Sequence, residues 1–113
     1  MMTNTHNLHR FTPEFVHKFP EACDLEYGKL YVLDDLTAVV HKCPCSPSCK
    51  INVMVPTAEK VPPGGERIWE ITAWDGYVSL YPSIQSFESK TNGSGLHPHA
   101  CYTITNNEIN WHK

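Results

Sequence analysis

The chain has 113 residues, 41% of them hydrophobic and 19% charged, with a formal net charge of −3. This length fits a single domain at 11–113 behind a loose polar terminus at 1–10, with no room for a second core. The acidic balance and the scattered Lys and Arg residues argue against a nucleic-acid or anionic-membrane binder, and no stretch approaches the roughly 20 apolar residues of a membrane span.

The five cysteines are an odd number, and the chain starts with the polar run Met-Met-Thr-Asn-Thr-His, which is unlike a secretory signal. We therefore expect a reducing, cytoplasmic environment. Disulfides are rare there, and clustered cysteines usually bind a metal or act in catalysis.

The first half of the chain predicts one short helix followed by three strands. Thr12 and Pro13 fit a helix cap and a first helical position, and Pro20 would end that helix. Period-two apolar patterns then predict short strands at 30–33, 37–40 and 51–55. Residues 56–67, which are rich in Pro and Gly, are expected to form an irregular loop.

A hairpin is expected over residues 69–81, because Asp75-Gly76 is a strong signal for a type I′ turn. The turn sets Trp74 opposite Tyr77 and Ile71 opposite Leu80. By strand alternation Ile71 and Leu80 face the core, whereas Trp74, Tyr77 and Tyr81 share the other face.

A second hairpin is expected to turn at Asn106-Asn107. Its register places Ile104 opposite Ile109 and Tyr102 opposite Trp111, all facing the core, and makes Cys101 and His112 neighbours on the other face. The whole pattern predicts a mainly β, small α+β fold: a twisted antiparallel sheet with two hairpins, one short N-terminal helix and a zinc knuckle.

The segment from His41 to Cys49 carries one imidazole and three thiols within nine residues. Cys45 and Cys49 have the spacing with which one loop presents two thiolates to tetrahedral zinc, and Cys43 adds a third. A second cluster, at 97–101, offers a fourth ligand from Cys101 or His99. We therefore predict one Zn²⁺ ion on these residues; the alternative is three independent buried thiols.

Five segments resemble a family of small bacterial and phage zinc-knuckle proteins associated with bacterial ubiquitin-like conjugation operons. The family pattern reads His-x-Cys-Pro-Cys-Gly-Cys-Gly, then Leu-x-Pro-Ser-Ile-Gly, then Cys-x-Ser-His-Tyr-x-Ile. The resemblance is carried by residues 19–21, 28–32, 38–49, 78–84 and 102–111, and the last family pattern aligns with residues 98–104. The resemblance covers nearly the whole chain from about Phe15, and it implies a peptidase that processes or deconjugates a ubiquitin-like partner.

The chain departs from this pattern at several positions. Cys45-Ser-Pro-Ser-Cys49 is two residues longer than the family's Cys-Gly-Cys, and Gln85 stands where the family has Gly. Cys101 stands where the family has His, and Pro98 where it has Cys. Exchanging His for Cys keeps a zinc ligand but removes a possible base, so a mechanism that uses this His does not carry over.

The enzyme hypothesis uses Ser83 as a nucleophile and His41 as its base, with His99 as the alternative base, because a serine needs a base within hydrogen-bond reach. Pro-Ser after a strand also fits an ordinary turn, and a histidine beside a zinc knuckle is often a ligand or supports one. Another alternative is a zinc hydrolase in which water is the fourth ligand. A third is a non-catalytic zinc module that binds a ubiquitin-like or other protein through exposed Trp74, Tyr77 and Tyr81.

Overall fold

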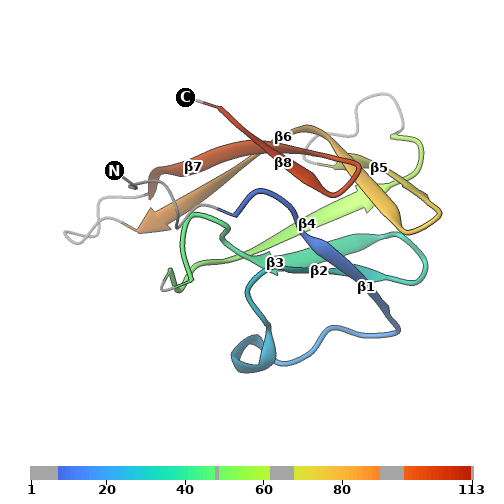
Figure 1. Cartoon of the computed structure of the whole chain (residues 1–113), viewed down its shortest axis with the longest axis horizontal. Coiled ribbons are helices and arrows are strands. Elements are labelled where there is room, and N and C mark those ends of the chain that lie inside the picture. Colours follow the sequence, from blue (N-terminus) through green and yellow to red (C-terminus); the bar gives the residue numbers. More distant parts are fainter. Residues whose placement is uncertain (1–7, 48, 62–67, 90–95, 113) are drawn as a thin grey trace.

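The structure is a computed structural model that describes residues 8–47, 49–61, 68–89 and 96–112, with only the backbone described at 86–89 and 96–100. Within these residues, eight strands form one sheet whose spatial order follows the chain (Figure 1). The strands are β1 (Thr12–Val16), β2 (Lys29–Leu33), β3 (Ala38–Lys42), β4 (Asn52–Ala58), β5 (Trp69–Trp74), β6 (Tyr77–Ser89), β7 (Leu96–Thr105) and β8 (Glu108–Trp111). A single 3₁₀ turn, η1 (Ala22–Asp24), lies between β1 and β2.

The two ends of this sheet are joined to each other. Arg10, just before β1, forms an antiparallel bridge with Glu108 of β8. On either side of the bridge, the Phe11 N–H donates to the Asn107 carbonyl and the Ile109 N–H donates to the His9 carbonyl, both at 2.8 Å. This seam makes the sheet curl round on itself, so each strand has an inner and an outer face.

The core fills the inside of the curled sheet. Along β4, Val53, Val55 and Thr57 are buried and alternate with exposed residues, as expected for a strand with one face packed. The most deeply buried hydrophobic residues come from β2, β3, β5, β6 and β7 and from the seam: Phe11, Leu30, Val32, Val39, Ile71, Val78, Leu80, Ile84, Tyr102 and Ile104. On the outer face of β2 and β3, Tyr31 and Val40 are also buried, in a smaller second cluster with Leu25.

Both predicted hairpins are confirmed in register. Trp74 pairs with Tyr77 and Ile71 with Leu80, while Ile104 pairs with Ile109 and Tyr102 with Trp111. The turn residues Asp75, Gly76, Asn106 and Asn107 all have positive φ, which type I′ turns require and which Asn, Asp and Gly tolerate best. The Asn107 side chain is buried and accepts the Val78 N–H at 2.8 Å, so the second turn is tied to the first hairpin.

The predicted helix at Thr12 is wrong, since Thr12–Val16 form β1 and pair in parallel with β2. An isolated helix of about eight residues is marginal, and pairing with an open strand stabilises the extended form instead. Pro13 is compatible with this arrangement because its fixed φ also suits an extended strand near an edge. No helix in the described ranges is long and apolar enough to cross a membrane.

The predicted strands at 30–33, 37–40 and 51–55 correspond to β2, β3 and β4. The predicted loop at 56–67 begins later than expected, because β4 continues to Ala58. Residues 62–67 lie outside the described residues. The sheet also contains two parallel pairs, β1 with β2 and β4 with β5, which makes it mixed rather than antiparallel.

Candidate metal centre and surface serine

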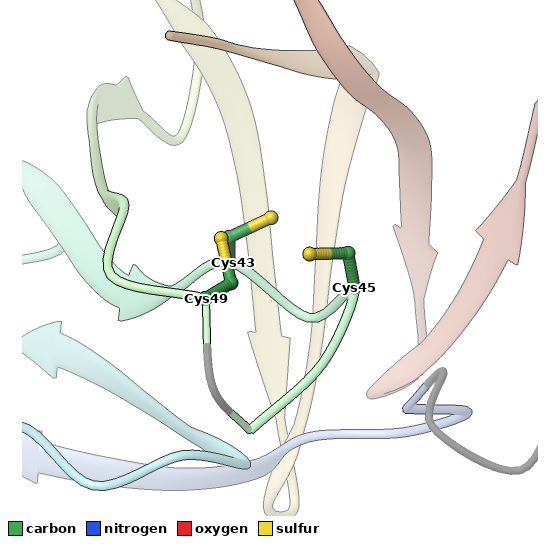
Figure 2. A group of neighbouring side chains, drawn as sticks. All are labelled: Cys43, Cys45 and Cys49. Carbon is green, nitrogen blue, oxygen red and sulfur yellow. The ribbon is translucent and has the colours of Figure 1, made fainter.

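The cysteine loop, residues 43–51, connects β3 to β4. The strand pairing reaches Lys42 opposite Asn52, and the Cys43 N–H then donates to the Ile51 carbonyl at 2.9 Å, which closes the base of the loop. Within the loop the Cys49 N–H donates to the Ser46 carbonyl at 3.1 Å, so the chain turns back on itself. Figure 2 shows the result: the side chains of Cys43, Cys45 and Cys49 point their sulfur atoms toward one another.

The three sulfur atoms lie within 4.8 Å of one another. A tetrahedral zinc ion with Zn–S bonds of about 2.3 Å holds its sulfur ligands about 3.8 Å apart, so a small contraction would complete the arrangement. Burial raises the pKa of Cys45 to about 12, together with hydrogen bonds to the Cys49 and Cys43 thiols and, last, the repulsion between adjacent thiolates. A divalent cation removes that repulsion and deprotonates its ligands, so this thiol group fits a metal.

The loop is fixed to the rest of the fold through Pro44. Its carbonyl accepts the Tyr27 hydroxyl at 3.0 Å and the Leu8 N–H at 3.0 Å. The Pro44 side chain is itself buried. The loop that carries the three thiols is therefore held in place by two other parts of the chain, at Leu8 and Tyr27.

Cys101, predicted as a fourth ligand, does not belong to the thiol group found among the described residues. Its neighbour Tyr102 is buried, so strand alternation turns Cys101 to the outer face of β7. The predicted proximity to His112 is confirmed, because the His112 N–H donates to the Cys101 carbonyl at 2.9 Å. The side chain of His99 lies outside the described part of the structure.

His41, predicted as a base, lies inside the sheet with 0% of its surface exposed. Its ring lies between Phe11 and Tyr102, with centroid distances of 4.7 and 5.9 Å. Nδ1–H donates to the Lys42 carbonyl at 2.9 Å, which leaves Nε2 to accept the Tyr102 hydroxyl at 3.4 Å. Burial lowers the pKa of His41 to about 4, only partly offset by the hydrogen bond to Lys42, so the ring is neutral near pH 7.

Ser83, the predicted nucleophile, lies on the outer face of β6 at a bulge. Leu80 pairs with Ile104 and Ile84 with Tyr102, so residues 81–83 together stand opposite Thr103 alone. Ile84 is buried and Ser83 is exposed, which puts the hydroxyl on the solvent side. The structure thus separates Ser83 from His41, and within the described residues no hydrogen bond joins them.

An open pocket of about 460 Å³ lies beside the bulge. Its walls are mostly apolar, with one cation and one anion, and comprise Lys60, Val61, Ile68, Glu70, Tyr81 and Pro82. The Trp69 indole N–H donates to the Ser83 carbonyl at 3.1 Å and ties the bulge to β5. The sequence did not predict this pocket, because its lining residues come from β5, β6 and the connection before β5, and no local sequence pattern shows that these segments meet.

An exposed aromatic row leads along the first hairpin toward this pocket. Trp74 is 79% exposed, Tyr81 is 69% exposed and Tyr77 is also exposed, as the predicted register requires. Tyr81 belongs to both the row and the pocket wall. The row, the pocket and Ser83 therefore lie on the same outer face of the sheet.

One comparison with known proteins finds a match. The family model described as "Bacterial ubiquitination-like system serine protease (BubE)" matches residues 15–112, which is most of the chain. No curated protein and no solved structure matches it.

Proposed function

Because the chain belongs to the BubE family of bacterial ubiquitination-like system serine proteases, we propose that it hydrolyses the bond that follows the C-terminus of a ubiquitin-like protein. The bond is either a peptide bond in a precursor or an isopeptide bond in a conjugate. The observation that supports this most directly is the exposure of Ser83 on a strand bulge, next in the chain to Pro82, which lines the pocket.

Ser83 is the proposed nucleophile. Its Oγ attacks the scissile carbonyl carbon while a base takes the hydroxyl proton, and the acyl-enzyme that forms is then hydrolysed by water. A bulge leaves backbone N–H groups outside the regular ladder, where they are free to stabilise the negative oxygen of the intermediate. The fixed backbone of Pro82 and the Trp69 hydrogen bond hold this turn in place.

The base that serves Ser83 is proposed to lie on the outer face of the sheet. The burial of His41 supports a structural role for that ring, since a neutral, fully enclosed imidazole with a low pKa is a weak base and both its nitrogens are engaged. His99 on β7 is kept as a candidate base.

Zinc is the proposed metal of the thiol group, held by Cys43, Cys45 and Cys49. Three thiols form part of the Cys₄ and Cys₃His sets that structural zinc uses, and the supported loop suits a site that stabilises the fold. When bound, the ion cross-links the ends of β3 and β4. A fourth ligand from Cys101 or His99 would require those side chains to reach the loop.

Substrate recognition is assigned to the aromatic row. Aromatic side chains dominate the energetics of interfaces, and the row leads directly to the pocket beside Ser83. We propose that the body of the ubiquitin-like protein binds Trp74 and Tyr77 while its C-terminal tail lies across Tyr81 to Ser83.

The direct test is cleavage of a ubiquitin-like protein from a bacterial ubiquitination-like system, extended at its C-terminus by a short peptide. We expect the purified protein to release the extension, with intact-mass measurement giving a product that ends at one defined residue. An uncleaved substrate under conditions where the two proteins still bind would contradict the proposal. That outcome would support the second candidate, a non-catalytic module, which the exposed aromatic row favours independently.

Recognition has its own prediction. Replacing Trp74 with Ala is expected to raise KM for the extended substrate about 10-fold or more with little change in kcat, because Trp74 contacts the substrate body far from the reacting bond. Phe15→Ala is the matched control, since Phe15 is another exposed aromatic residue but lies on β1. Equal KM changes in the two variants would remove the aromatic row from the proposal.

A further inference from the structure

We propose that His112 is the base that takes the proton of Ser83, and that Thr103 positions its ring; this rests on the proposed function. Neither residue belongs to the motifs that suggested catalysis. Both lie on the outer face of the sheet: Thr103 is in β7, and His112 directly follows β8.

The register of three neighbouring strands brings these residues together. Tyr102 and Ile104 are buried, so Thr103 between them faces outward. The His112 N–H donates to the Cys101 carbonyl, which extends the β7–β8 pairing by one residue and keeps His112 beside β7. The His112 ring then reaches back over β7, where Nε2 lies 2.5 Å from the Thr103 hydroxyl oxygen.

Ser83 approaches Thr103 from the opposite side. Thr103 is the one residue of β7 that faces the bulge at 81–83, and Ser83 is exposed on that outer face. Neighbouring strands lie about 4.8 Å apart, so once the ring has crossed to β7 a single strand spacing separates it from β6. Side-chain rotation can close such a gap, and catalytic hydrogen bonds often tighten only when substrate binds.

Three other histidines have described side chains, and each is poorly placed for this role. His9 precedes β1 at the seam, where its carbonyl accepts the Ile109 N–H, so β8 and β7 lie between it and β6. His41 is enclosed in the core. His17 follows β1, at the far end of the sheet order from β6, and its Nδ1 lies 2.7 Å from an Asp34 carboxylate oxygen. His112, in contrast, is exposed and hydrogen-bonded to a hydroxyl group that faces the bulge.

His112 alone can carry the proton in both the acylation and the hydrolysis step. When Nδ1 carries the ring proton, the Thr103 hydroxyl donates to the Nε2 lone pair in the free protein and holds the ring over β7. This hydrogen bond opens when the Ser83 hydroxyl takes its place at Nε2. When Ser83 Oγ bonds to the carbonyl carbon, its proton moves to Nε2, and the imidazolium returns it to the leaving nitrogen as the C–N bond breaks. Water then bonds to the acyl carbon, giving one proton through Nε2 to Ser83 Oγ as the ester bond breaks.

The experiment measures how fast a fluorophosphonate probe labels the protein, with the labelled residue identified by mass spectrometry. In this reaction Ser83 Oγ bonds to phosphorus and fluoride leaves, so no substrate is needed. We expect His112→Gln to slow both the labelling of Ser83 and the cleavage of the extended substrate by about 100-fold or more. Thr103→Val should slow both less, and Thr103→Ser should restore the rate.

Chemical rescue separates a base from a structural residue. Added imidazole should restore part of the labelling rate of His112→Gly, whereas it should not rescue Ser83→Ala. Metal content and melting temperature should stay at the unmodified values in His112→Gln, because the side chain is exposed.

The outcomes that overturn the inference differ from those that overturn the proposed function. Labelling of His112→Gln at the original rate, or loss of labelling in His99→Gln instead, would reject His112 as the base and leave Ser83 standing. Labelling at a residue other than Ser83 would reject the serine assignment itself.

Discussion

Replacing Cys49 with Ser is expected to release the bound metal and remove most of the stability of the protein. Structural zinc binds finger peptides with about 10–16 kcal/mol of apparent free energy, while whole domains are stable by only about 5–15 kcal/mol. Losing one of three converging sulfur ligands also leaves Cys43 and Cys45 crowded without a cation. Metal analysis should give about one zinc ion per chain before the change and none after it, and thermal unfolding should begin far lower.

The matched control for this change is Cys23→Ser. Cys23 is exposed and lies outside the thiol group, so its removal should alter neither metal content nor melting temperature. A chelator should lower the melting temperature of the Cys23→Ser protein as much as that of the unmodified chain. Unmodified protein that contains no zinc, or a Cys49→Ser protein as stable as its parent, would show that the three thiols are ordinary core residues.

Replacing Ser83 with Ala is expected to lower turnover of the extended substrate at least about 10³-fold, because the nucleophile is lost while binding is retained. Stability should change by less than about 0.5 kcal/mol, since the hydroxyl is exposed and only the main-chain carbonyl of Ser83 accepts a described hydrogen bond. KM and zinc content should stay close to the original values.

Ser79→Ala is the control on the same strand. The Ser79 hydroxyl accepts the Asn106 N–H at 2.8 Å, so this variant should lose some stability and keep its turnover. Full activity in Ser83→Ala would exclude the serine mechanism. If chelation then removed that activity, a metal-bound water would be the better explanation, because only three protein ligands converge among the described residues.

The sequence predicted those parts of the fold that have a local cause. Asp75-Gly76 and Asn106-Asn107 need positive φ, which selects the turn type, and the turn type sets the register of both hairpins. The parallel pairing of β1 with β2 has no such signal. It depends on which strand edge of the folded sheet still lacks a partner. Pairing of residues 12–16 with that edge is more favourable than the helix that Thr12 and Pro13 suggested.

The sequence likewise predicted only those parts of the candidate site whose residues are close together in the chain. The spacing of Cys43, Cys45 and Cys49 identifies the thiol group, because neighbours within one loop can meet whatever the rest of the fold does. The role of His41 depends on which face of β3 points into the core. Because Val39 and Val40 are both apolar, the sequence does not show whether His41 faces the core or the outside. The contact between Thr103 and His112 requires the register of the second hairpin one residue beyond its last strand.

The seam between the start of the chain and β8 has a consequence for how the protein folds. Every other pairing in the sheet joins strands that follow each other along the chain, so each can form early, at the modest entropic cost of closing a short loop. The contact of Arg10 with Glu108 joins opposite ends and should close last. Until it does, β1 and β8 are open edges that can pair with another chain. Residues 8–11 thus close the sheet, and they also supply the core residue Phe11. Their truncation should therefore destabilise the core and favour aggregation during refolding.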